Sequence, residues 1–175
     1  MPIRENFLSS ERLCFGFWRE SDIDLAWELF GDSDITKYVG GPFSRAQVLE
    51  RIRSEMSSRE CIGVQYWPLF RRDDGEFVGC CGLKSCPEPG CYEMGFYIKP
   101  SMQGKGYAWE AACRVIEYAF SKIGAKALFA GHSPHNEASR LLLGKLGFVY
   151  TSDVFYPPTG LMHPLYRLDQ KLQKK

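Results

Sequence analysis

A glycine-rich run carries the clearest chemical signal in the sequence. It lies between a predicted strand and a predicted helix and reads Gln103-Gly104-Lys105-Gly106-Tyr107-Ala108. Glycine lets a backbone come close to a ligand, and the first-turn amides of a helix have no intrahelical partner. Together with the positive end of the helix dipole, these groups favour binding of a phosphate or pyrophosphate. The alternative interpretation is a tight turn that needs glycine only for its backbone angles.

Two common nucleotide-binding motifs do not fit this run. The dinucleotide fingerprint requires a third glycine at the position of Trp109, and the P-loop pattern is absent. The order of predicted strands and helices also differs from that of a Rossmann-type protein. We therefore expect an anion site of another kind.

Histidines and cysteines could bind a metal, but their spacing argues against it. His132 and His135 form an H-x-x-H pair without a third ligand nearby, and the seven cysteines include no C-x-x-C pair. We expect no metal site. Cys86 and Cys91 flank a predicted turn that could bring them together as a disulfide, but free thiols in a reducing cytosol are the favoured interpretation.

The predicted elements that position these residues alternate between strands and helices. Period-2 patterns and turn residues predict strands at 13–18, 62–71, 76–84, 92–98, 126–130, 148–155 and 165–172. Caps and 3.6-residue periodicity predict helices at 21–30, from 44 onward with a Ser44–Gln47 capping box, at 108–120 and at 136–146. This order predicts an α/β or α+β domain with a mixed sheet.

Composition narrows the class of protein further. The chain has 175 residues, 45% of them hydrophobic, and a net charge of +1. One domain with a real core is expected at this length, and bulk charge gives no reason to expect a nucleic-acid or membrane partner. The first residues lack the apolar stretch of a signal peptide, and no window is apolar enough to span a membrane. We therefore expect a cytoplasmic protein; both a monomer and a homodimer remain open.

Read with its neighbours, the glycine run resembles a known signature. The pattern Gln103-x-x-Gly106-x-Ala108 is similar to the pyrophosphate-binding motif of the GNAT superfamily of acetyl-CoA-dependent N-acetyltransferases. The resemblance extends over nearly the whole chain, in the family's order, through the segments 17–22, 38–42, 93–98 and 136–148. It is nearest to the branch of ribosomal-protein alanine and serine N-terminal acetyltransferases.

The resemblance implies a fold and a site for the cosubstrate. It implies one domain over residues 1–175, with a mixed seven-stranded sheet, about four helices, and splayed fourth and fifth strands whose gap holds the pantetheine arm of acetyl-CoA. Backbone groups of Phe96 and Ile98 would pair with that arm, and Asn136 would hydrogen-bond it besides capping its helix. The pyrophosphate would be held by Gln103, Gly104, Gly106, Tyr107 and Ala108. Lys105 would add charge near the nucleotide phosphates, or is a solvated loop lysine.

The resemblance also implies direct attack of an amine on the thioester. Glu93 is then the candidate base or base relay, with the alternative that it only pairs with a basic residue across the sheet. Many family members carry a tyrosine acid seven residues after the asparagine, where this chain has Leu143. Ser139 is the candidate donor to the departing sulfur and a contact to the cosubstrate; otherwise it is a serine bonded within its helix.

The expected function is acetyl transfer to a primary amine, either a protein N-terminus or a small molecule. His132 and His163, the latter in the predicted loop 157–164, are candidates to line the acceptor cleft. The alternative function is a noncatalytic acyl-CoA-binding module on the same fold, which Leu143 alone favours.

Overall fold

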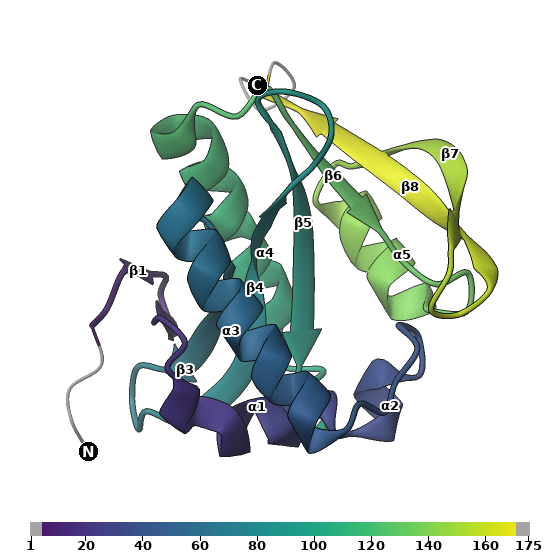
Figure 1. The fold of residues 1–175 in the computed structure, drawn as a ribbon. Coiled ribbons are helices and arrows are strands. Elements are labelled where there is room, and N and C mark those ends of the chain that lie inside the picture. The colour runs from purple at the N-terminus through teal and green to yellow at the C-terminus, as the bar shows by residue number, and fades with distance from the viewer. Residues whose placement is uncertain (1–4, 171–175) are drawn as a thin grey trace.

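The computed structural model describes residues 5–170. In this part of the chain, eight strands form one mixed sheet in the order β1-β2-β3-β4-β5-β6-β8-β7 (Figure 1). The strands are β1 Leu8–Ser9, β2 Leu13–Phe15, β3 Tyr66–Arg71, β4 Phe77–Ser85, β5 Cys91–Ile98, β6 Ala127–Gly131, β7 Val149–Tyr156 and β8 Leu161–Asp169. The α-helices are α1 Ile23–Phe30, α2 Ser33–Thr36, α3 Arg45–Ile62, α4 Tyr107–Tyr118 and α5 Glu137–Lys145, and shorter helical turns lie at Glu20–Asp22, Pro100–Met102 and Ala119–Ile123.

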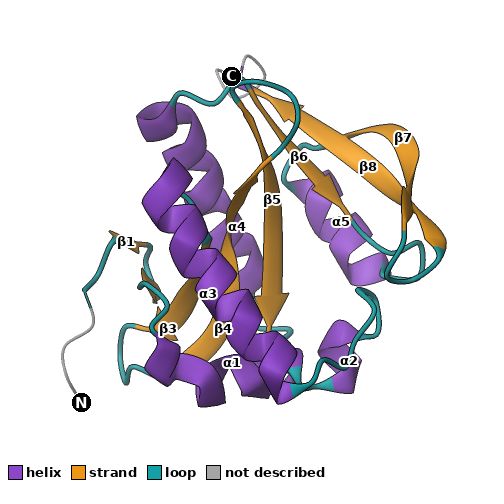
Figure 2. Cartoon of the chain, in the orientation of Figure 1, coloured by secondary structure: helices purple, strands orange, loops and turns teal. Residues whose placement is uncertain are grey.

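Helices cover both faces of the sheet and give the molecule three layers (Figure 2). Alternate residues of β3 divide the core: Trp67 packs in the cluster that contains α4, whereas Tyr66 packs in the cluster that contains α1 and α3. Because successive side chains of a strand point to opposite faces, the buried strands are apolar on both sides. The same alternation decides which residues of β5 face the functional site.

The sheet has eight strands, so the expected count of seven was wrong. The additional strand is β1, a two-residue edge strand in which Leu8 is paired with Phe15 of β2. A segment of two residues is too short to show a period-2 pattern, so no local pattern predicts it. The mixed sheet flanked by helices is as expected.

Helix α3 begins as predicted and extends to the first residue of the range predicted as a strand. Ser44 Oγ accepts a hydrogen bond from Gln47 N, and Gln47 Oε1 accepts one from Ser44 N, which completes the capping box. The helix runs through Ile62 and stops at Gly63, whose φ of 77° suits a left-handed C-cap. The strand predicted from position 62 was therefore wrong at its start, because alternating apolar residues around the cap imitate a strand.

Two further elements differ from expectation near the site. Short helix α2 was not predicted; the Asp32 side chain caps it by accepting hydrogen bonds from Asp34 N and Ile35 N. Strand β8 begins inside the predicted loop 157–164, so His163 lies on a strand, opposite Val154 of β7. Pro164 obscured the strand in the sequence, because proline is unusual within strands.

Strands β5 and β6 diverge, as the resemblance implied for the fourth and fifth predicted strands. They pair in parallel only at Cys91–Ala127, Tyr92–Leu128 and Glu93–Phe129. Beyond Glu93 the rest of β5 pairs only with β4, and Figure 1 shows β6 turning away toward β8. The strand edge from Met94 to Ile98 is therefore left without a ladder partner on the β6 side.

No helix within residues 5–170 combines the length and the apolar character needed to cross a membrane.

Candidate active site

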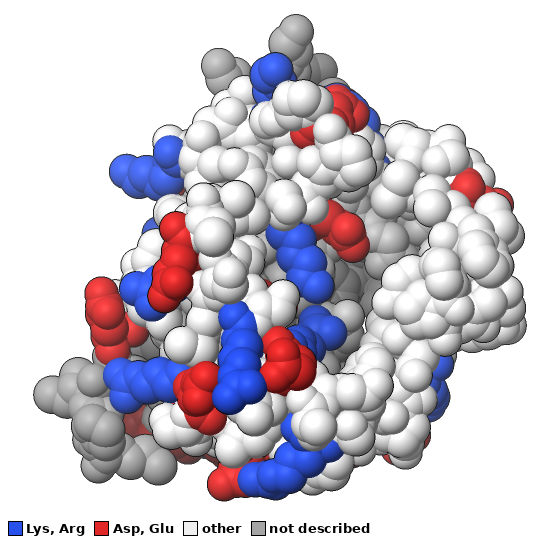
Figure 3. Space-filling view, in the orientation of Figure 1, with Lys and Arg blue, Asp and Glu red and all other residues white. Residues whose placement is uncertain are grey.

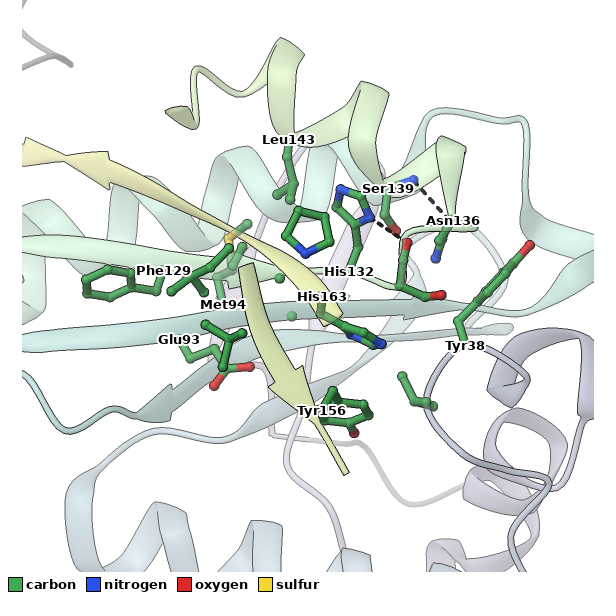
Figure 4. A pocket seen from close by; sticks show the side chains of 18 of the residues that line it. Tyr38, Glu93, Met94, Phe129, His132, Asn136, Ser139, Leu143, Tyr156 and His163 are labelled. Atoms are coloured by element: carbon green, nitrogen blue, oxygen red, sulfur yellow. Dashed lines mark hydrogen bonds between the residues drawn. The ribbon is translucent and has the colours of Figure 1, made fainter. Parts of the chain in front are cut away.

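A cavity of about 560 Å³ opens where β5 and β6 separate. In the space-filling view a hollow lies between the body that carries α3 and the β7–β8 hairpin, with charged side chains along its α3 side (Figure 3). The close view shows side chains from several elements turned toward it (Figure 4). The residues singled out from the sequence that line the cavity are Cys86, Glu93, Phe96, His132, Asn136, Ser139, Leu143 and His163.

Glu93 lies at the point of divergence. It is the last residue of β5 that pairs with β6, and its direct partner on β4 is Lys84. Burial lowers the pKa of Lys84, and the nearby Arg51 charge lowers it further, whereas Glu55 and Glu93 oppose the shift. Glu93 therefore lies at the cavity and is also the cross-strand neighbour of a basic residue, so its position is compatible with both interpretations.

Helix α5 presents its first turn to the cavity. Asn136 Oδ1 accepts a hydrogen bond from Ser139 N at 3.1 Å, so the expected N-cap is present. This contact uses the carbonyl oxygen of Asn136 and leaves its NH₂ group available as a donor. The side chain of Leu143, 1% exposed, lies between the cavity and the core, and supplies no hydroxyl.

The glycine run forms the turn that leads from β5 into α4. Gly106 is the N-cap residue with a φ of 82°, and no side chain caps this helix, in contrast to α3 and α5. Gln103 Nε2 donates to Ile98 O at 3.0 Å and ties the turn to the end of β5. The amides of the first turn of α4 are thus free of a side-chain acceptor, which suits an anion.

Arg12 packs against this turn, a neighbour that the sequence did not reveal. Its Nη1 donates to Lys105 O at 3.0 Å, and its guanidinium lies 4.6 Å from the ring centroid of Tyr107. Arg12 Nε also donates to Glu110 Oε2 at 2.7 Å. Burial alone would raise the pKa of Glu110, but hydrogen bonds from Ser10 and Arg12 hold it below its usual value. Arg12 is more than ninety residues from this turn along the chain, so no local motif connects them.

The two histidines of the cavity have different surroundings. His132 Nδ1 lies 2.7 Å from Ser133 O, and its Nε2 lies 3.2 Å from the Tyr166 hydroxyl. His163 Nε2 lies 3.0 Å from Thr159 Oγ1. Burial lowers the pKa of His163, and the nearby His132 lowers it further.

A buried polar cluster lies beneath the cavity on the α3 side of the sheet. Glu55 Oε2 accepts a hydrogen bond from Tyr66 N at 2.7 Å. Burial raises the pKa of Glu55, although this hydrogen bond and the charges of Lys84 and Arg51 oppose the shift. Arg51 lies 4.1 Å from the Phe30 ring centroid. Through Tyr66 and Lys84 this cluster connects α3 with β3 and β4, and β4 pairs with β5, the strand that carries Glu93.

The loop after α2 approaches the β7–β8 turn at the edge of the cavity. Gly40 has a φ of 91°, and a Cβ atom added to it would lie 2.7 Å from Pro158 O. Only glycine fits this approach without displacing the turn. Tyr38 and Val39 of the same loop line the cavity, so this contact helps to define its boundary.

The seven cysteines are all free, so Cys86 and Cys91 form no disulfide. Burial raises the pKa of Cys80 to about 12. Within residues 5–170, no group of three or more His, Cys, Asp or Glu side chains is arranged to hold a metal ion.

Comparison with known proteins gives a consistent result. Residues 12–149 match the family described as acetyltransferase (GNAT) domain. The chain is 28% identical over 149 residues to the uncharacterized N-acetyltransferase YoaA of Bacillus subtilis, which covers 81% of each chain. It is 33% identical over 86 residues to the [ribosomal protein uS5]-alanine N-acetyltransferase of Escherichia coli, 47% of this chain and 44% of that one.

Solved structures show the same fold. An acetyltransferase (GNAT family) from Bacillus anthracis aligns with a TM-score of 0.83 at 21% identity, over 94% of this chain and 98% of that chain. RimL, a ribosomal L7/L12 alpha-N-protein acetyltransferase in complex with coenzyme A, aligns with a TM-score of 0.79 at 14% identity and the same coverage.

Proposed function

Because the chain belongs to the GNAT acetyltransferase family, we propose that it transfers the acetyl group of acetyl-CoA to a primary amine held in the cavity between β5 and β6. The named relatives are N-acetyltransferases, and the present chain is an enzyme of this class. We further propose that one N-acetyltransferase domain spans residues 1–175. The acceptor is either a protein N-terminal amine or a small-molecule amine.

The unpaired edge of β5 carries this proposal. From Met94 to Ile98 the backbone has no ladder partner on the β6 side, and the edge leads through the short helical turn Pro100–Met102 into the glycine turn. Phe96 and Ile98 would pair with the pantetheine arm through their backbone groups. A Cβ atom added to Gly104 would meet nothing within 4 Å, so the turn has open space beside its backbone. These features fit an extended ligand that ends in a pyrophosphate.

The glycine turn would hold the pyrophosphate of acetyl-CoA through backbone groups. The residues proposed for this role are Gln103, Gly104, Gly106, Tyr107 and Ala108. Lys105 and Arg12 would add positive charge beside the phosphates. Arg12 is a new member of this set, and its bonds to Lys105 O and Glu110 hold its guanidinium against the turn.

Acetyl-CoA supplies the activated acetyl thioester that the amine attacks. The attacking nitrogen has to lose protons during the reaction, and Glu93 is a proposed proton acceptor, directly or through water. Asn136 would donate its NH₂ group to the pantetheine arm while its oxygen caps α5. Ser139, one turn further, would donate to the departing sulfur. Because a thiolate is a good leaving group, the absence of a tyrosine at Leu143 is compatible with turnover.

The names of two relatives suggest the acceptor class to test first. They describe acetylation of ribosomal proteins, one at an alanine and one at an alpha-amine. We propose that short peptides with free N-terminal amines are the first acceptors to test for this chain, followed by small amines.

Calorimetric titration with acetyl-CoA is the direct test of the proposed binding site. We expect saturable binding with one site per chain, and weaker binding when Gly106 is replaced. Absence of binding by the folded protein would contradict both acetyl transfer and the alternative of a noncatalytic acyl-CoA-binding module.

A further inference from the structure

Two histidines line the cavity, and only one of them has both ring nitrogens engaged. A carbonyl oxygen can only accept, so the 2.7 Å contact to Ser133 O makes His132 Nδ1 a donor. In the neutral ring His132 Nε2 is then the acceptor, and the Tyr166 hydroxyl at 3.2 Å donates to it. Both ring nitrogens of His132 therefore have hydrogen-bond partners, and these bonds fix the ring in the wall of the cavity.

His163 is held by one nitrogen, and the contacts of Thr159 assign its tautomer. Thr159 Oγ1 lies 3.4 Å from Tyr156 O and 3.0 Å from His163 Nε2. A hydroxyl has one hydrogen, and the carbonyl can only accept, so both contacts are satisfied only if Thr159 donates to Tyr156 O and accepts from His163 Nε2–H. A neutral imidazole with its hydrogen on Nε2 has a free lone pair on Nδ1, which has no hydrogen-bond partner within the described part of the chain.

The surroundings of His163 keep this lone pair available. The ring is 9% exposed, lines the cavity and packs on the Tyr156 ring at 4.5 Å between centroids. Burial and the neighbouring His132 both lower the pKa of His163, which favours the neutral ring. The other titratable groups that line the cavity, besides His132 and Cys86, are Tyr38, Tyr66, Glu88, Glu93, Tyr97 and Tyr156.

We propose that His163 Nδ1 accepts the first proton from the ammonium form of the acceptor, while Thr159 fixes the ring in the required tautomer. The inference rests on the proposed acetyl transfer and adds a second proton acceptor to it. Glu93 comes from β5 and His163 from β8, so the two groups approach the cavity from different strands (Figure 4).

The two acceptors account for the two protons that the nitrogen loses. The ammonium gives one proton to His163, which releases it to solvent. The neutral amine then forms the N–C bond as the C–S bond breaks. The second nitrogen proton leaves through Glu93 and ends on the coenzyme A sulfur, for which Ser139 is the proposed donor. The products are the acetylated amine, coenzyme A and one free proton.

The pH dependence of kcat/KM in the wild type and in His163→Gln tests this proposal. Glutamine retains an N–H near the position of His163 Nε2 for Thr159 and removes the titrating lone pair. We expect kcat/KM at pH 7 to fall about 10²-fold, the typical lower range for a lost proton acceptor. In the wild type, kcat/KM should fall toward acidic pH as His163 becomes protonated, at a pH below the ordinary range of an imidazole. The pH profile of the variant should lack this titration. The Kd for acetyl-CoA should stay within about twofold.

Two further variants complete the design. His135→Gln alters an exposed histidine outside the cavity lining and should leave kcat/KM unchanged. Thr159→Val removes the group that fixes the tautomer and should lower kcat/KM less than His163→Gln, with the titration retained. If His163→Gln does not fold, an unchanged kcat/KM in Thr159→Val contradicts the proposal.

The outcomes separate this inference from the proposed function. Wild-type kcat/KM and an unaltered pH profile in folded His163→Gln would overturn the role of His163 while leaving acetyl transfer intact. A wild-type protein that acetylates no amine would contradict the proposed function itself, and this inference with it.

Discussion

Glu93 stands directly opposite Lys84 in the β4–β5 ladder and is also the last residue through which β5 pairs with β6. One position therefore lies both beside a partly buried cation and at the opening between the strands. The Lys84 ammonium lies 4.6 Å from the Tyr66 ring centroid, so it belongs to the polar cluster under the cavity. If Glu93 accepts a proton, replacing Glu93 and replacing Lys84 should have different effects. If Glu93 is only a structural partner of Lys84, the two replacements should have similar effects.

Glu93→Gln should lower kcat about 10²- to 10³-fold, because an amide cannot accept the amine proton. The Kd for acetyl-CoA should change little, since Glu93 lies at the opening between the strands and not in the glycine turn. Steady-state acetyl transfer and calorimetry measure the two quantities. Lys84→Gln is the matched control and should lose much less activity. Equal losses of turnover and affinity in both variants would show that the pair is structural.

Gly106→Ala should weaken acetyl-CoA binding about tenfold or more, because the added methyl group occupies the space beside the first-turn amides of α4. The new Cβ would lie 3.4 Å from Arg12 Nη2. Gly124→Ala is the control: Gly124 follows the helical turn Ala119–Ile123 that continues α4, has a φ of 73° and has nothing within 4 Å of an added Cβ. Calorimetry on both variants separates backbone strain from a blocked site. Equal affinities would argue against an anion site at this turn.

Gly40→Ala should raise the KM for the amine severalfold, because its Cβ would displace the β7–β8 turn at Pro158. Gly75 has a φ of 74° and open space around an added Cβ, so Gly75→Ala carries the same backbone strain, about 1–2 kcal/mol, without the collision. Steady-state kinetics with varied amine distinguish the two variants. A KM unchanged in Gly40→Ala would show that this loop does not bound the acceptor site.

Glu55→Gln should change how stability depends on pH. Burial raises the pKa of Glu55, so between its usual value near 4.5 and the raised value the native state binds more protons than the unfolded state. The free energy of unfolding contributed by this group therefore falls as pH rises through that window. Glutamine keeps an acceptor for Tyr66 N and removes the titration, so its stability relative to wild type should increase from pH 4 to pH 7.

Urea unfolding of wild type, Glu55→Gln and Glu55→Ala across this range measures the effect. The alanine variant loses the acceptor for Tyr66 N and should be less stable than the glutamine variant by about 1–3 kcal/mol. A difference between wild type and Glu55→Gln that does not vary with pH would contradict a raised Glu55 pKa.

Local patterns predicted most of the fold. The capping box at Ser44, the N-cap at Asn136 and the helical periodicity before Phe120 appear in the structure at the expected places. The errors fall where local patterns mislead. Strand β1 is too short to show a period. Apolar alternation predicted that a strand starts at Ile62, which belongs to the helix that ends before Gly63, and Pro164 hid the start of β8. Of these elements, β8 pairs with the distant β6 as well as with β7.

The site was predicted only in its local parts. Glu93, Asn136 and Ser139 could be proposed because short motifs carry them, and all three line one cavity. Arg12 and the glycine turn meet through tertiary packing, so the sequence did not connect them. The tautomer of His163 likewise depends on the turn that brings Thr159 onto its ring.

Acetyl transfer itself is the most direct test of the central claim. Purified protein is incubated with acetyl-CoA and a panel of primary amines that includes peptides with free N-terminal alanine or serine. Product mass is the readout, because the chain's seven free cysteines interfere with assays of released thiol. The account predicts at least one amine that gains a single acetyl group with wild type and far less with Glu93→Gln. Binding of acetyl-CoA without acetylation of any amine would contradict it and would favour a noncatalytic module.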